Sequence, residues 1–103
     1  MESPQKTDDQ PSIQIHIPET LESGQYANLA ISNYSQEEFM LDFVFLHLQQ
    51  GRGKLLSRIV LSPRNAKRIA QLLQINIADY EAKFGKISHD ESQNNAGIKL
   101  NFN

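Results

Sequence analysis

The stretch from Gly24 to Gly85 constrains the fold more than any other part of the chain. It holds three segments with strand composition, separated by turns, and then one long amphipathic helix. Strands in series followed by a helix are typical of an α+β domain with a mostly antiparallel sheet. No catalytic or metal motif interrupts this stretch, so the sequence predicts a fold without predicting an activity.

The sheet is expected to be a meander of four strands, at residues 12–17, 25–33, 38–48 and 54–61. The first alternates isoleucines with polar residues and ends at Pro18, because proline cannot donate to a strand ladder. A turn is expected at 33–37. The last two strands are apolar on both faces, which predicts that both faces are covered. Gly51 and Gly53, in the turn between them, are expected to supply positive φ angles.

The helix is expected to begin at Ser62-Pro63 and to run to about Phe84. Serine is a strong N-cap, proline suits the first helical position, and Gly85 is well placed just after the end. One apolar stripe is expected to face the core, with Leu72 at its edge and Ile75 pointing away. The stripe consists of Ala66, Ile69, Ala70, Leu73, Ile77, Tyr80 and Phe84.

A chain of 103 residues is one domain at most. Residues 1–11 are predicted to be a disordered arm, 12–85 a single α+β domain and 86–103 a polar tail. The tail ends in a short strand pattern at 98–102. This strand either adds to the sheet edge of its own or a second copy, or serves as a docking peptide for another protein.

The expected core takes side chains from every predicted element except the tail. It comprises Ile15, Leu29, Ile31, Leu41, Phe43, Val44, Ile59, Leu61, Ile69, Leu73, Ile77, Tyr80 and Phe84.

Composition narrows the functional classes. The absence of cysteine excludes disulfides, thiol catalysis, iron–sulfur clusters and cysteine-ligated zinc. His16, His47 and His89 have no second ligand at metal spacing, and neither a phosphate-binding loop nor a nucleophile elbow is present. We therefore expect no cofactor and no enzymatic activity. The polar N-terminal residues resemble no signal peptide and no apolar run could span a membrane, which predicts a cytoplasmic protein.

The two central strands carry more apolar surface than one helix can cover. A patch larger than a few hundred Å² is unusual on a monomer, so a homodimer that buries the second sheet face is expected. The alternative is a small barrel-like sheet that closes on itself.

Asp42 lies inside an otherwise apolar strand, and a buried carboxylate must be paired or neutralised. The expected partner is an arginine such as Arg58 on the next strand, or backbone donors. The less favoured alternative is a catalytic acid or base. Asn28 and Asn76, in apolar elements, are expected to bond to backbone groups.

Six basic residues and no acid lie between residues 51 and 68. Those in the first two turns of the helix oppose its macrodipole, while Asp79 and Glu81 oppose it near the other end. Either this is a solvated face, or it is a site for nucleic acid, phosphate or an acidic protein surface. The candidate anion-binding residues are Arg52, Lys54, Arg58, Arg64, Lys67 and Arg68.

A combination of short segments resembles the small prokaryotic family catalogued as domain of unknown function number 3467. The resemblance covers about residues 13–85 and departs from the family pattern in the segment 47–51. It implies a cytoplasmic prokaryotic protein and brings no catalytic residues. The segments are Tyr26-Ala27-Asn28, Glu38–Phe43, Arg58–Pro63, Asn65–Arg68 and Asn76-Ile77-x-x-Tyr80-Glu81-x-x-Phe84-Gly85.

These observations favour a non-enzymatic, homodimeric protein-interaction module. The alternative function is binding of nucleic acid or phosphate through the basic stretch 52–68. Steep salt dependence of binding would distinguish the second from the first.

Overall fold

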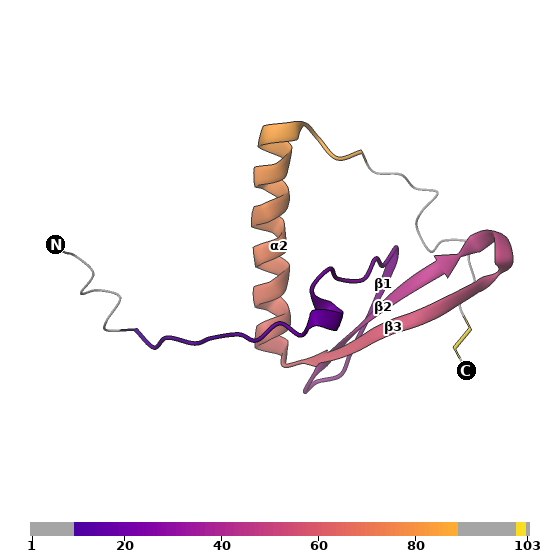
Figure 1. Ribbon diagram of the computed structural model, residues 1–103, viewed down its shortest axis with the longest axis horizontal. Coiled ribbons are helices and arrows are strands. Elements are labelled where there is room, and N and C mark those ends of the chain that lie inside the picture. The colour runs from indigo at the N-terminus through magenta and orange to yellow at the C-terminus, as the bar shows by residue number, and fades with distance from the viewer. Residues whose placement is uncertain (1–9, 89–100, 103) are drawn as a thin grey trace. The chain divides into compact units, whose positions relative to one another are not determined.

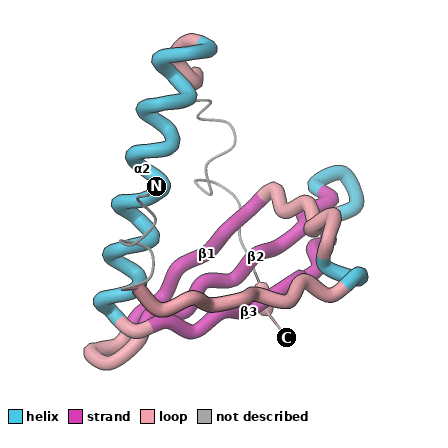
Figure 2. Tube along the Cα trace, turned by 60° about the vertical axis from the view of Figure 1, so that its left-hand side comes forward, coloured by secondary structure: helices cyan, strands magenta, loops and turns pink. Residues whose placement is uncertain are grey.

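The computed structural model describes residues 10–88 and 101–102 of the chain (Figure 1). Three strands form one antiparallel sheet in the order β1-β2-β3, and a long helix follows them (Figure 2). The elements in chain order are η1 (Glu19–Leu21), β1 (Leu29–Tyr34), β2 (Phe39–His47), η2 (Leu48–Gln50), β3 (Arg52–Leu61) and α2 (Pro63–Phe84). The prediction of an α+β fold with one C-terminal helix is confirmed.

The chain divides into two compact units. The first combines Met1–Ser32 with Leu41–Ile59, and the second combines Asn33–Met40 with Val60–Asn103. The first therefore holds η1, η2 and most of the sheet, and the second holds the β1–β2 turn and α2.

The predicted strand at 12–17 is absent, because these residues have no regular secondary structure. Ile13, Ile15 and Ile17 are 79%, 82% and 62% exposed. Alternation makes a segment suitable for a sheet, but a strand also needs a neighbour to which its backbone can bond. The tail strand predicted at 98–102 lies largely outside the described residues. The two described residues of that segment, 101 and 102, are not in a strand.

The predicted chain reversal is present, but it lies at 35–38, since residues 33 and 34 of the predicted turn still belong to β1; it is part of the second unit. The Ser35 amide donates to the Glu38 carbonyl at 2.9 Å. The Ser35 hydroxyl in turn accepts from the Glu37 amide at 3.2 Å. A short side chain that bonds to the backbone two residues on is the reason serine favours such turns.

The two glycines of the β2–β3 turn have different roles. Gly51 has a φ of 65°, as predicted, and ends η2. Gly53 does not have a positive φ, so that prediction is wrong. A Cβ at position 53 would lie 2.8 Å from the Cδ2 atom of Leu46. The constraint at position 53 is therefore the neighbouring Leu46 side chain, which would have to move to admit a Cβ, and not an unusual backbone angle.

The pairing of β2 with β3 contains one irregularity. Gly53 faces Leu46, and Arg58 bonds to Asp42. The two β2 residues share one face of their strand, whereas positions 53 and 58 would lie on opposite faces of a regular strand. The ten residues of β3 also run beside nine of β2. An extra residue, as in a β-bulge, reconciles these contacts.

Helix α2 starts and stops where the sequence predicts. The Ser62 hydroxyl accepts from the Asn65 amide at 3.2 Å, and Pro63 is the first helical residue. At the other end Gly85 has a φ of 100°, and its amide donates to the Glu81 carbonyl at 3.0 Å. Both ends are thus fixed by local chemistry that does not depend on packing.

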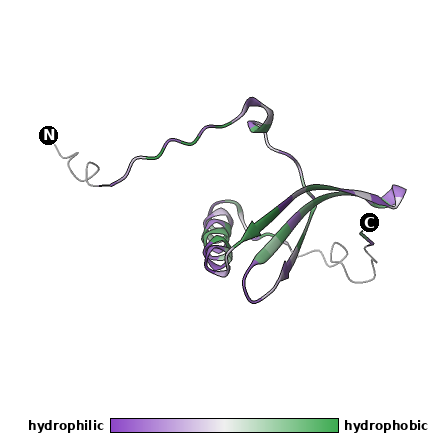
Figure 3. Ribbon diagram, turned by 90° about the horizontal axis from the view of Figure 1, so that it is seen from below, coloured by the Kyte–Doolittle hydropathy of each residue, from purple (hydrophilic) through white to green (hydrophobic). Residues whose placement is uncertain are grey.

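The buried core is much smaller than predicted. Among the described residues only Val44 and Asp42, both on β2, are buried, at 6% and 3% exposure. No residue of α2 is buried, and the helix carries both hydrophobic and hydrophilic residues along its length (Figure 3). The core predictions for Ile15, Ile59, Ile69, Leu73, Ile77, Tyr80 and Phe84 are wrong for the single chain, since all seven are exposed. An apolar stripe signals that a partner exists without saying whether it belongs to the same chain.

Candidate functional site

An ion pair links β2 and β3 in the first unit. The Arg58 Nε donates to Asp42 Oδ1 at 2.8 Å, and an Nη donates to Asp42 Oδ2 at 2.9 Å. The Asp42 side chain is 4% exposed and that of Arg58 is 50% exposed. This two-point geometry matches the planar guanidinium fork. Of the two kinds of partner predicted for Asp42, an arginine on the next strand or backbone donors, the structure shows the arginine.

The ion pair also sets the protonation of both groups. The hydrogen bond from Arg58, aided by its charge, holds the pKa of Asp42 below the usual value, against the opposing effect of burial. The hydrogen bond and charge of Asp42 raise the pKa of Arg58. An ionised carboxylate with both oxygens occupied is poorly suited to act as a proton acceptor. Its geometry therefore indicates a structural role.

Asn28 continues the β1–β2 pairing with its side chain. Its amide group donates to the Leu46 carbonyl at 3.0 Å, and its Oδ1 accepts from the Leu46 amide at 2.8 Å. Its backbone amide donates to the Val44 carbonyl at 3.2 Å. The prediction that Asn28 bonds to backbone groups is confirmed. The carboxamide satisfies one donor and one acceptor of β2 just before β1 begins.

An aromatic surface lies beside this contact, defined here by Tyr26, Phe43, Phe45 and His47. The Phe45 ring packs edge to face against the rings of Tyr26 and His47. The distances between ring centroids are 6.2 Å to Tyr26 and 4.5 Å to His47. Tyr26 is 77% exposed, whereas Phe43 and Phe45 are partly buried. The sequence indicated the alternation of phenylalanines on β2, but Tyr26 precedes β1, and no periodic pattern placed its ring against Phe45.

Within the second unit, Tyr34 stacks on Phe39 with 5.5 Å between ring centroids. The two residues flank the β1–β2 turn, and Tyr34 is 77% exposed. This cross-strand pair closes the turn in the way that aromatic pairs stabilise hairpins.

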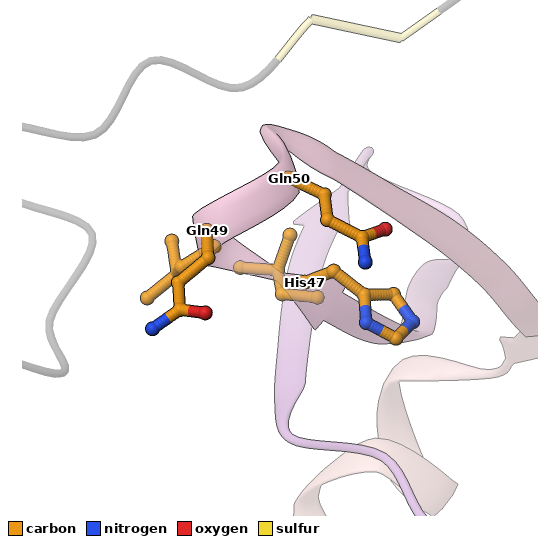
Figure 4. A pocket seen from close by; sticks show the side chains of 5 residues that line it. His47, Gln49 and Gln50 are labelled. Atoms are coloured by element: carbon orange, nitrogen blue, oxygen red, sulfur yellow. The ribbon is translucent and has the colours of Figure 1, made fainter.

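A shallow hollow of about 280 Å³ lies at the β2–β3 turn (Figure 4). Its lining is the consecutive stretch Leu46, His47, Leu48, Gln49 and Gln50. A ligand pocket usually gathers polar groups from several elements around an apolar cavity. This hollow is formed by one stretch of chain, so it has the character of a curved turn.

The candidate anion-binding residues divide between the two units. Arg52, Lys54 and Arg58 lie on β3 in the first unit, where Arg58 bonds to Asp42 and an Arg52 Nη donates to Gln50 Oε1 at 2.9 Å. The residues Arg64, Lys67 and Arg68 lie in the first two turns of α2, and all three are exposed. The structure thus assigns Arg58 an internal partner and groups the other candidates into two sets.

Two further properties concern the described part of the chain alone. Residues 10–88 and 101–102 contain no group of three or more His, Asp or Glu side chains arranged to hold a metal ion. No helix within those residues has the length and apolarity needed to cross a membrane.

Comparison with known proteins identifies the chain at the level of its family. Neither a curated protein nor a solved structure shows significant similarity to it. One family model matches residues 1–89, which is most of the chain and includes both the Asp42–Arg58 ion pair and helix α2. The chain therefore belongs to the family described as "Protein of unknown function (DUF3467)".

Proposed function

We propose that this protein is a non-enzymatic, cytoplasmic protein-interaction module that forms a homodimer. The observation that carries the proposal is the apolar surface that a single chain leaves exposed. On the sheet, Leu55, Ile59 and Val60 of β3 are 43%, 42% and 54% exposed. On α2, every residue of the apolar stripe is at least partly exposed. Soluble monomers seldom present this much large aliphatic surface to water.

The sheet contributes the aromatic surface to this proposed dimer. Phe45 packs edge to face against both Tyr26 and His47, so the three rings are in contact before any partner binds. A pre-organised aromatic cluster loses little side-chain entropy on binding, and such residues dominate interface energetics. On the opposite face of β2, Asp42 and Val44 are buried, so that face of the strand offers less apolar surface to a partner. The aromatic surface is therefore the sheet face that we propose the two copies share.

Two differently tagged copies of the full chain, mixed and captured through one tag, test the proposal. The second tag should be retained, and excess untagged chain should compete it away. If the second tag is retained no better than on beads without the captured copy, self-association is contradicted. Heat-denatured chain, captured in parallel, controls for adhesion of unfolded protein.

The second candidate function is nucleic-acid or phosphate binding through the basic stretch 52–68. One observation favours it. Arg64, Lys67 and Arg68 are exposed, and the described residues provide none of them with an ion-pair partner. Fluorescence anisotropy of labelled single- and double-stranded oligonucleotides tests this. Binding that weakens steeply with salt, and that is lost when the three are replaced by glutamine, is the expected signature. An unchanged anisotropy at low salt would remove this candidate.

A further inference from the structure

The apolar residues of α2 follow a spacing that the amphipathic stripe alone does not require. Six of them are separated by 4, 3, 4, 3 and 4 residues, and we call this set the seam: Ala66, Ala70, Leu73, Ile77, Tyr80 and Phe84. This is a repeat of 3.5 residues, sustained over nearly three heptads. Such a repeat keeps one line of side chains facing a second helix along the whole contact.

Among the described residues, five of the six seam residues are exposed and Ala66 is partly exposed. Leu73, Ile77, Tyr80 and Phe84 are 58%, 41%, 50% and 72% exposed. The rings of Tyr80 and Phe84, one turn apart, lie 5.0 Å from each other and present a continuous apolar surface. Most helices in proteins owe their stability to packing of such a face, so the seam calls for a partner.

The sizes of the seam residues favour an antiparallel partner of the same sequence. The first two are alanines and the last two are aromatic. With the two-fold axis passing at the level of Ile75, Ala66 lies opposite the partner's Phe84 and Ala70 opposite the partner's Tyr80. The outer layers then combine a small side chain with a large one, and the central layers pair Leu73 with the partner's Ile77, as dense packing requires. A parallel pair would stack aromatic on aromatic at one end and leave space between alanines at the other.

The charges along α2 favour the same orientation. Lys67 and Glu81 flank the seam on the same side, at equivalent heptad positions. In an antiparallel pair these positions face each other, so Lys67 lies beside the partner's Glu81, and the contact occurs twice. Glu81 already accepts from the Ile87 amide at 2.9 Å, which orients its carboxylate. Asp79 is held only loosely, 3.6 Å from Lys83, with both side chains 65% exposed.

This arrangement also accounts for charges that oppose their own helix. The cations Arg64, Lys67 and Arg68 lie at the positive end of the α2 macrodipole, where cations are disfavoured. The C-terminal end of an antiparallel neighbour would bring the negative end of a second macrodipole beside them. A charge pattern that is unfavourable in one helix becomes favourable in the pair.

We propose that two copies of this chain pair through α2, antiparallel, with the seam buried and Lys67 beside the partner's Glu81. The two helices cross at about 20°, the geometry of left-handed coiled coils. This inference rests on the proposed homodimer and names a second surface that holds it together. Its test must therefore separate the failure of helix pairing from the failure of dimerisation.

Single cysteines provide that test, because the chain contains none. One tagged copy carries Ala70→Cys, and a copy with a tag of different mass carries Tyr80→Cys. After mixing and mild oxidation, the expected product is the disulfide-linked heterodimer of the two variants. Neither variant should link to itself, because two antiparallel copies separate equivalent residues 70 by roughly 15 Å along the axis, beyond disulfide reach. Ala82→Cys, far from the seam, is the matched control and should not link to any copy.

Charge reversal gives a second test that leaves the seam intact. Lys67→Glu should raise the dimer dissociation constant about tenfold, since two attractive contacts become repulsive. The double variant Lys67→Glu with Glu81→Lys should restore most of the affinity. Both side chains lie at the surface of α2, so circular dichroism should show an unchanged helix. Equal dissociation constants for wild type and Lys67→Glu would overturn the pairing.

The remaining outcomes are distinct. Self-linking of Ala70→Cys alone would indicate parallel helices and overturn the proposal. No linkage in any mixture, with tagged copies still co-eluting, would leave a dimer formed through the sheet and would likewise overturn helix pairing. Loss of co-elution as well would overturn the homodimer itself.

Discussion

At the scale of single residues, the Asp42–Arg58 ion pair is the clearest link from sequence to structure. A carboxylate within an apolar strand requires a partner, and the partner lies on the adjacent strand at 2.8 Å. We expect Asp42→Ala to lower the melting temperature by about 5 °C or more, because the Arg58 guanidinium loses both acceptors. The affinity of the folded variant for a partner, such as a second copy of the chain, should not change. Superimposable melting curves for variant and wild type would refute this role.

The same ion pair predicts a pH dependence with a definite sign. Arg58 lowers the pKa of Asp42 in the folded chain below the ordinary value of 3.8, so the folded state binds this proton less readily than the unfolded state. The stabilisation is therefore complete well above pH 3.8 and is lost as the pH falls through the lower folded value. In thermal melts at a series of pH values, the stability gap between wild type and Asp42→Asn should narrow below pH 3.8. A gap that stays constant into this acidic range would contradict the account.

Asn28 offers an isosteric test at the same scale. Asn28→Asp keeps the acceptor for the Leu46 amide but removes the donor to the Leu46 carbonyl. The free energy of unfolding should fall by about 1–2 kcal/mol at neutral pH, measured by urea denaturation. Asn33→Asp, at the exposed end of β1, is the matched control and should change it little. Equal losses at both positions would show that the added charge matters and the hydrogen bond does not.

The residue partners could be predicted more readily than their register. Burial physics alone predicted that Asp42 needs a partner, either an arginine or backbone donors, and that Asn28 bonds to backbone. The register depended on the irregularity between Gly53 and Arg58, which one extra residue creates. Strand alternation has a period of two, so a single inserted residue reverses the predicted faces without leaving a signal in composition.

At the scale of elements, short sequence signals were sufficient to predict helix ends and turns, because neighbouring residues fix these features. The boundaries of α2 follow from Ser62-Pro63 and Gly85, and the β1–β2 turn follows from Ser35. The prediction of a strand at 12–17 was wrong, because a strand forms only where its backbone can bond to a neighbouring strand. The stripe of α2 was predicted to face the core of the chain, and its residues are instead at least partly exposed. Amphipathicity carries no information about which chain supplies the contact.

The N-cap of α2 yields a prediction at this scale. Ser62→Ala removes the acceptor for the Asn65 amide, which is 3.2 Å from the hydroxyl. The free energy of unfolding should fall by about 1 kcal/mol in urea denaturation. Ser62→Asp should retain most of the stability, because aspartate also caps and its charge suits the positive helix end. An aspartate variant as unstable as the alanine variant would argue against capping.

At the scale of the whole molecule, the described residues contain too little buried apolar surface for a chain that carries so many large apolar side chains. Val44 is the only buried hydrophobic residue among them, while exposed ones occur on β3, on α2 and at Ile13–Ile17. Small domains are the ones that most depend on oligomerisation to bury surface. We expect a second copy to bury part of this apolar surface, as the proposed homodimer requires.

Sedimentation equilibrium of the full chain over a wide concentration range tests that claim most directly. We predict a weight-average mass that rises from that of one chain, 11.7 kDa, towards twice that value as concentration increases. Ile77→Asp, at the centre of the seam, should shift this rise to higher concentration, while Gln71→Asp on a polar face of α2 should not. A mass that stays at 11.7 kDa at the highest concentration would contradict the account.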